Sequence, residues 1–344
     1  MFLIHSPLIL THLPYMPPTT ITKRDTETLK GVAILMMLWL HLFHGLPWVS
    51  LSTPIFIIEG IPFVTILTNA TNPVYFFTFL SGYGLYLSYL NKGRKNVLRV
   101  KKIYIQYWIC TIPFVIAGAL LKKNNYPGDI LTILYNLTGW YTTYNGTIWF
   151  LLPYSLLAMS SSMLFKFYDK LNIFILCTII TCLYLCCLTI LHFWGKYLFT
   201  HQLAYMPEHY CELLCPFTIG YISAKYGRLD LLEKKLGHGW KPLGLLLIIF
   251  FIMIFVNSTL SAILYPLYVM AFCFLFVLLK KPVWLQNIFI HLGKVSTSMW
   301  FVHAYFCWYF FSNIVYSLKY PLLIFLFLVI ISYITALLIR LIYR

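Results

Sequence analysis

Ten stretches of mostly apolar residues alternate with short polar segments along the chain. A helix that crosses a membrane needs about 20 such residues, and shorter ones are tolerated inside a bundle. We therefore predict ten membrane-spanning helices, over residues 29–49, 72–90, 104–121, 147–165, 171–193, 209–224, 242–257, 259–279, 296–313 and 321–340. The sixth is the weakest prediction, because it is short and carries Glu212 and Pro216.

Two segments outside these spans interrupt the pattern. Residues 50–71 are apolar but contain Pro54 and Glu59, which predicts a re-entrant or interfacial segment. Residues 1–28 are predicted to be a cytoplasmic or interfacial tail, because prolines break their apolar run and no basic start typical of a signal peptide precedes it. Residues 29–344 then form one transmembrane domain, whose short loops leave the function to the helices themselves.

Composition agrees with this pattern. Of the 344 residues, 61% are hydrophobic and 10% are charged, whereas a soluble domain has about 25% charged residues. So few charges cannot cover the surface of a soluble protein of this size. Soluble, disordered, collagen-like and disulfide-framework classes are therefore excluded, and the predicted fold class is an all-α polytopic membrane protein.

The formal net charge of +16 reflects membrane topology. Cytoplasmic loops of membrane proteins are enriched in Lys and Arg. With ten spans and the N-terminus in the cytoplasm, the C-terminus is cytoplasmic as well. The outer side then keeps four of the 25 basic residues, namely Lys122, Lys123, Lys196 and Lys319. A wrong span count would remove this asymmetry, so the asymmetry supports the predicted topology. Because topology explains the excess of basic residues, nucleic acid is not an expected partner.

The nine cysteines do not indicate a metal or redox centre. Most lie inside apolar runs, and none forms a CxxC pair with a histidine partner. Cysteine in such runs is usually a small packing residue. We therefore expect no bound metal and no permanently bound cofactor.

Ionisable groups inside predicted spans are the candidates for chemistry, because each costs a few kcal/mol in lipid unless it is paired or hydrated. Lys30 and His41 are eleven residues apart in the first span, which places them on one helix face about 16 Å apart. Glu27 shares that face and can pair with Lys30. His44 adds a second imidazole one turn above His41. The alternative is that Lys30 is a charged anchor and His41 a hydrogen-bonded packing residue.

Later spans carry further candidates. Ser296 and His303 are seven residues apart, on one face of the ninth span, and Trp149 begins the fourth. The small pair Ser81–Gly82 in the second span predicts close helix packing, and Ser81 and Trp149 are expected to be more structural than catalytic. The other histidines considered, His192, His201, His209 and His291, are expected at interfaces or in loops.

Taken in order, several of these segments resemble the integral-membrane acyltransferase 3 family, which includes bacterial polysaccharide O-acetyltransferases. LKGVAILMMLWLH matches a family opening like LRGIAALLVVLYH, and FFTFLSGY matches its second helix. LRVKKIY resembles the basic RRxxR-like loop, WFL follows, and GKVSTSMWFVH matches a late GKISYSLYLVH-like segment. The likeness covers residues 24–340. In the family an arginine stands where this chain has Lys30, which keeps the charge but lacks the planar fork.

The resemblance implies an acyl-CoA donor, commonly acetyl-CoA, on the cytoplasmic side and an acceptor hydroxyl outside, on a cell-envelope glycan or lipid-linked sugar. His41 would then be the general base. Ser296 and His303 would orient the donor or stabilise the oxyanion, unless they only tie helices together. Lys30 and the basic residues Arg99, Lys101 and Lys102 would meet the coenzyme A phosphates, unless they only anchor the helix in the membrane.

Acceptor contacts are expected from the residues near the outer side: His44, Glu59, Glu212 and Trp149. Either glutamate would hydrogen-bond the acceptor or orient His41. The predicted location is a bacterial plasma membrane.

Two other functions remain open. A transporter or flippase for a glycan or lipid-linked intermediate would use the buried Lys, His and Glu as a substrate or proton path. However, the chain shows neither an inverted repeat nor paired broken spans. The third possibility is a structural partner of a polysaccharide export complex, which the lysine at position 30 leaves open.

Overall fold

Helices form most of the protein, which we describe from a computed structural model covering residues 20–91 and 95–342. In the first half they are α1 (Lys23–Phe43), α2 (Leu46–Val49), α3 (Phe63–Ile66), η1 (Leu67–Ala70), α4 (Pro73–Leu90), α5 (Asn96–Leu120), α6 (Ile130–Thr138), η2 (Gly146–Phe150) and α7 (Leu151–Tyr168). In the second half they are α8 (Ile173–Thr200), α9 (Gln202–Tyr226), α10 (Leu229–Leu236), α11 (Trp240–Phe255), α12 (Ser258–Val277), α13 (Val283–Ala304), the π-helical η3 (Tyr305–Phe310), α14 (Ser312–Tyr316) and α15 (Pro321–Ile342).

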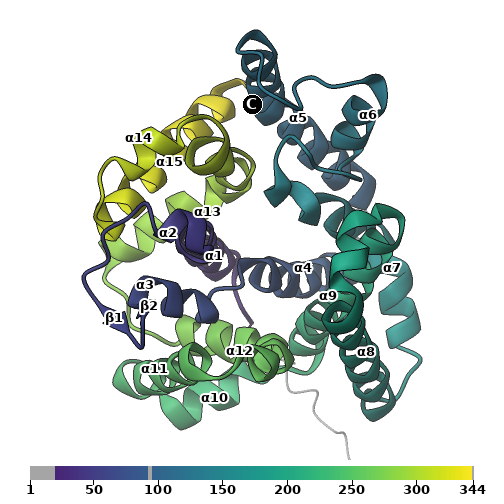
Figure 1. The fold of residues 1–344 in the computed structure, drawn as a ribbon. Coiled ribbons are helices and arrows are strands. Elements are labelled where there is room, and N and C mark those ends of the chain that lie inside the picture. Colours follow the sequence, from purple (N-terminus) through teal and green to yellow (C-terminus); the bar gives the residue numbers. More distant parts are fainter. Residues whose placement is uncertain (1–19, 92–94, 343–344) are drawn as a thin grey trace, which may run out of the picture.

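The first helix lies at the centre of the bundle. Figure 1 shows α1 with α13 and α15 on one side, α11 and α12 on another, and α4 leading outward to α7, α8 and α9. The most extensive helix pairs are α1 with α13 and α4 with α9. The first of these pairs brings the two ends of the sequence together, and both of its members carry candidate histidines.

An all-α membrane protein is confirmed. Among the described residues, six helical segments are long and apolar enough to cross a membrane, namely α1, α5, η2–α7, α8, α12 and α15. The pair α10 and α11, bent by 108°, makes a seventh if it forms one span. Helices also lie on the other predicted segments, as α4, α9 and α13. The number of ten spans and the cytoplasmic termini stay predictions.

Several helix boundaries differ from the predicted spans. α1 begins at Lys23 instead of residue 29, because Thr22 and Asp25 form a reciprocal capping box. It ends at Phe43, and the short α2 follows a break that contains Gly45. The polar start of α1 therefore belongs to the helix. Residues 1–19 of the predicted tail lie outside the described residues.

Two further helices are longer than predicted, because polar residues interrupt their apolar pattern. α13 begins at Val283, well before the predicted start at 296, and polar residues of this earlier part, Lys294 among them, line the hollows described below. α9 extends from Gln202 to Tyr226 and passes through Pro207 and Pro216. The weakest predicted span is thus a helix of 25 residues.

The segment predicted to be interfacial or re-entrant is built from short elements. Residues 46–70 form α2, α3, η1 and a hairpin of β1 (Ile57–Ile58) and β2 (Ile61–Pro62), with Ile58 opposite Ile61. This segment packs against the end of α1 through Trp39, whose Nε1 donates a hydrogen bond to the Val64 carbonyl at 3.1 Å.

Glycines allow the two main helix pairs to pack at backbone contact. A Cβ at Gly31 of α1 would lie 2.0 Å from the Phe289 carbonyl oxygen, and one at Gly293 of α13 would lie 1.9 Å from the Glu27 carbonyl oxygen. Gly82 of α4 faces α9 in the same way, with Phe217 at 2.0 Å. Close approach through small residues is typical of membrane bundles, so the predicted role of Gly82 is confirmed.

Candidate functional site

The two histidines in the α1–α13 pair bond directly to each other. Nε2 of His303 lies 2.9 Å from Nδ1 of His41, and the two rings stack with centroids 4.8 Å apart. His303 is fully buried, whereas His41 is partly exposed. The sequence predicted His41 and His303 inside the first and ninth spans, but it could not show that they touch, because they are 262 positions apart.

The hydrogen bonds define which ring nitrogens carry protons. Nδ1 of His303 faces two main-chain carbonyl oxygens, Trp300 at 2.8 Å and Met299 at 3.2 Å. Carbonyls only accept, so this nitrogen must hold a proton, and Nε2 of a neutral His303 is an acceptor. His41 therefore donates from Nδ1, which leaves the lone pair of a neutral imidazole on its Nε2.

The π-helical turn after α13 fixes the other side of His41. Trp308 lies on η3, donates from Nε1 to the His41 carbonyl at 3.0 Å, and meets the His41 ring edge-on with centroids 4.9 Å apart. Its ring also stacks on Trp48 of α2 at 6.0 Å. Single π-helical turns are often found at functional sites because they re-aim side chains.

His41 opens into a cavity of about 400 Å³, which we call the His41 cavity. Its wall includes His44, which bonds Thr68 at 3.1 Å, and Trp149. Other polar members are Asn69, Asn72, Thr147, Ser258, Ser261 and Tyr265. The His41 ring is held beside this cavity by the hydrogen bond to His303 and by one to the Met37 main chain.

A second hollow lies around Lys30. This Lys30 cavity has a volume of about 430 Å³ and is lined by charged and polar groups from four helices: Glu27, Lys30, Gln106, Lys294, Ser296, Ser298 and Arg340. A smaller space of about 90 Å³ extends from Lys30 and Ser296 inward to Ser81, Tyr154 and Trp300. Gln106 of α5 bonds Ser298 at 2.7 Å and closes one side.

A thin wall separates the two hollows. Trp300 lines the inner end of the Lys30 side, and Thr147 lines the His41 cavity. Nε1 of Trp300 donates to the Thr147 carbonyl at 2.9 Å. The histidine pair lies next to this contact, since His303 bonds the Trp300 carbonyl.

The basic residues of α5 that are predicted to bind phosphate lie in different surroundings. Arg99 is half-buried and interacts electrostatically with Lys30 and Tyr154. Lys101 and Lys102 are exposed on α5 and line none of the hollows described above. Lys294 and Arg340, which sequence reasoning counted only as topology signals, instead line the Lys30 cavity.

The predicted acceptor residues are also spread over several places. Trp149 and His44 line the His41 cavity. Glu59 is exposed at the turn of the β1–β2 hairpin, in a left-handed backbone conformation. Glu212 is buried in the middle of α9 and bonds His209 and Tyr75 rather than His41. His209, expected at an interface or in a loop, is buried in the same helix.

Fold and site together define a helical membrane protein whose bonded histidine pair lies between two polar hollows. The family model of the acyltransferase 3 type, described as an acyltransferase domain, matches residues 25–341. The chain therefore belongs to this family and is a membrane acyltransferase. Comparisons with curated proteins and with solved structures gave no match.

Proposed function

We propose that the protein transfers an acyl group, most simply acetyl, from cytoplasmic acyl-CoA to a hydroxyl of a cell-envelope glycan on the outer side of a bacterial plasma membrane. The observation that carries this proposal is the histidine pair, because His41 lines a polar cavity while His303 is bonded to its Nδ1. A hydroxyl is a weak nucleophile and needs a base at the moment of attack.

The reaction balances with these groups. Nε2 of His41 takes the proton of the acceptor hydroxyl as its oxygen forms a bond to the thioester carbonyl carbon. The carbon–sulfur bond then breaks, and the departing coenzyme A thiolate receives the proton from the imidazolium. Throughout, the neutral His303 accepts from Nδ1 of His41 and stabilises the charged ring. His303 is thus a positioning residue.

The Lys30 cavity supports an anionic donor. Lys30, Lys294 and Arg340 surround it, and the neighbouring hollow adds Lys23 and Arg24. Coenzyme A carries several phosphates that such a basic cluster would hold. Lys30 and His41 lie about 16 Å apart along α1, so a donor held by its phosphates would extend its thioester towards Trp300 and the histidine pair.

The His41 cavity supports a sugar acceptor. Its wall combines the aromatic rings of Trp149 and Tyr265 with several amide and hydroxyl groups. A few placed polar groups on a partly aromatic surface are typical of sites for small polar ligands. His44, which bonds Thr68, would contact the acceptor rather than deprotonate it.

The test uses membranes that contain the protein, radiolabelled acetyl-CoA and glycan fractions of the host envelope. We expect release of free coenzyme A and label in an ester that mild alkali removes from the glycan. Membranes without the protein give the background. Coenzyme A release with label in another fraction would correct the acceptor. No release with acetyl-CoA, succinyl-CoA or longer donors would overturn the proposal and favour the transporter.

A further inference from the structure

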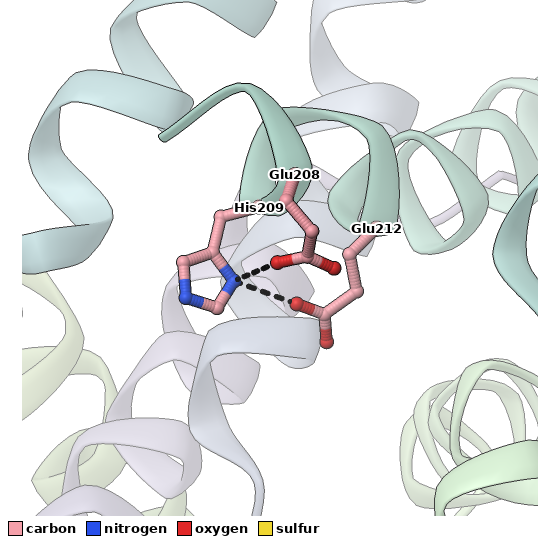
Figure 2. A group of neighbouring side chains, drawn as sticks. All are labelled: Glu208, His209 and Glu212. Carbon is pink, nitrogen blue, oxygen red and sulfur yellow. Dashed lines mark hydrogen bonds and ion pairs between the residues drawn. The ribbon is translucent and has the colours of Figure 1, made fainter. Parts of the chain in front are cut away.

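A cluster of three ionisable side chains lies in α9, apart from the histidine pair. Figure 2 shows Glu208 and Glu212 directed at Nδ1 of His209 from two sides. The distances from Nδ1 are 3.3 Å to Oε2 of Glu208 and 2.8 Å to Oε2 of Glu212. All three side chains are buried, with relative exposures of 8%, 7% and 8% in chain order.

The cluster has more negative charge than its surroundings compensate. Neither oxygen of Glu208 has a hydrogen-bond partner, and Nε2 of His209 has none either. Among the described residues, no lysine or arginine forms an ion pair with either glutamate. A buried carboxylate without a partner is strongly unfavourable. One imidazole between two carboxylates cannot neutralise both, and a bound cation would supply the missing positive charge.

We propose that Glu208, His209 and Glu212 bind one divalent metal ion of the zinc class. One ligand atom from each residue can be chosen so that all three lie within 4.8 Å of one another. Neighbouring ligands of a tetrahedral zinc ion are about 3.3 Å apart, given bonds of about 2.0–2.1 Å. The distance from Nδ1 to Glu208 equals this value, whereas the distance to Glu212 is a hydrogen-bond distance, 0.5 Å shorter, which a bound ion would lengthen. An imidazole nitrogen favours zinc over magnesium, which prefers oxygen ligands in an octahedron.

Neighbouring side chains complete the surroundings of a metal site. Tyr75 of α4 donates to Oε1 of Glu212, which leaves the Oε2 oxygen for an ion. Carboxylate ligands are commonly held in this way by an outer hydrogen bond. The rings of Trp149 and Tyr205 cover His209, with centroids 4.4 Å and 4.1 Å away. They shield the cluster from solvent.

One aromatic ring connects the cluster in α9 to the His41 cavity. Trp149 contacts His209 on one side and lines the His41 cavity on the other. A metal ion would lock His209 and with it the position of Trp149. The ion is therefore a structural element next to the acceptor side, and the acyl-transfer steps do not pass through it.

The test measures zinc binding to the purified full-length protein in detergent, after removal of metal with a chelator. Equilibrium dialysis against Zn²⁺ should give one tightly bound ion per chain and a higher midpoint of thermal unfolding. Glu208→Gln removes a ligand without removing a hydrogen bond, and Glu212→Gln keeps an acceptor for Tyr75. Each should weaken zinc binding at least about tenfold and abolish the thermal shift.

Glu59→Gln is the matched control, since it makes the same change at an exposed position, and it should bind zinc like the wild type. Equal zinc binding by Glu208→Gln and the wild type would overturn the proposal. Absence of a tight ion in the wild type would also overturn it, with Glu208 then a neutral acid. Equal competition by Mg²⁺ would refute the zinc class. The two ligand variants are compared with the wild type only as monodisperse samples. If neither variant gives such a sample, zinc binding by the wild-type protein decides the test.

Discussion

The chemistry of His41 depends on atoms that belong to the backbone of another helix. The Trp300 and Met299 carbonyls fix the proton on Nδ1 of His303, and His303 in turn fixes the proton on Nδ1 of His41. The Met37 carbonyl also accepts a hydrogen bond from the His41 ring, so main-chain groups of both helices hold the imidazole pair in place. The same relay orients the ring, because both imidazoles are stacked.

Replacement of His303 separates a positioning role from a packing role. The amide oxygen of Gln can accept a hydrogen bond near the place of the His303 Nε2, whereas Ala cannot. We expect His303→Ala to lower kcat by about 10- to 100-fold, as is typical when a residue that holds a functional side chain in place is lost. KM for acyl-CoA should stay unchanged. His303→Gln should recover part of the loss in kcat. The measurement is steady-state acyl transfer at several pH values. Activity should fall at low pH, because an imidazolium cannot accept a proton. Equal losses in both variants would show a packing role.

Substitutions of Lys30 test whether a positive charge alone is sufficient for donor binding at a position where related proteins are expected to have arginine. Lys30 lines both hollows on the donor side, next to Lys294 and Arg340. We expect Lys30→Met to raise KM for acyl-CoA about tenfold, since one charge-assisted hydrogen bond contributes about 1.5–3 kcal/mol. Lys30→Arg should stay near the wild type. A fall in kcat with unchanged KM in Lys30→Met would instead place Lys30 at the reacting atoms.

At the scale of helices, the apolar pattern predicted where helices lie better than where they end. Runs rich in Leu, Ile and Phe were sufficient to locate each segment. The starts of α1 and α13 were missed because polar residues there face the capping box and the basic hollows instead of lipid. Hydropathy indicates whether a side chain lies in apolar surroundings, and it does not indicate where a helix ends. The first turns of these helices are helical but carry polar residues.

Two glycines of α4 give a matched test of helix packing. A Cβ at Gly82 would lie 2.0 Å from the Phe217 carbonyl oxygen of α9, whereas a Cβ at Gly84 meets nothing within 4 Å. Gly82→Ala should therefore lower stability by about 1–3 kcal/mol through overpacking. Gly84→Ala should be neutral or slightly stabilising, because Ala is the better helix former by about 1 kcal/mol. Unfolding midpoints in detergent compare the two, and equal midpoints would contradict close α4–α9 packing.

At the scale of the whole molecule, four basic residues from four helices gather at one end of the central helix pair. Lys30 of α1, Lys294 of α13 and Arg340 of α15 line one cavity, and Arg99 of α5 lies close to Lys30. At the opposite end of α1, His44 contacts Thr68. The sequence predicted from loop charges that most basic residues lie on the cytoplasmic side, and that orientation stays a prediction. The sequence did not predict that charges counted as anchors would line a cavity, because that requires the pairing of distant helices.

Reporter fusions test the orientation directly. A fluorescent protein fused after Arg344 should fluoresce, because we predict a cytoplasmic C-terminus. A phosphatase inserted in the 122–146 loop should be active, because that loop is predicted to lie outside. The opposite result for both reporters would invert the topology and place the Lys30 cavity on the outer side. Two cytoplasmic or two outer results would refute the number of spans between them.

The central claim is that His41 removes the proton of the acceptor hydroxyl. The most direct test compares the initial rate of acetyl transfer from labelled acetyl-CoA by the wild type, His41→Gln and the matched control His192→Gln, at equal amounts of folded protein in the membrane. His192 is exposed on α8. The account predicts that His41→Gln loses about 10²–10⁴-fold in rate, while His192→Gln stays at the wild-type rate. Transfer by His41→Gln at the wild-type rate would contradict it.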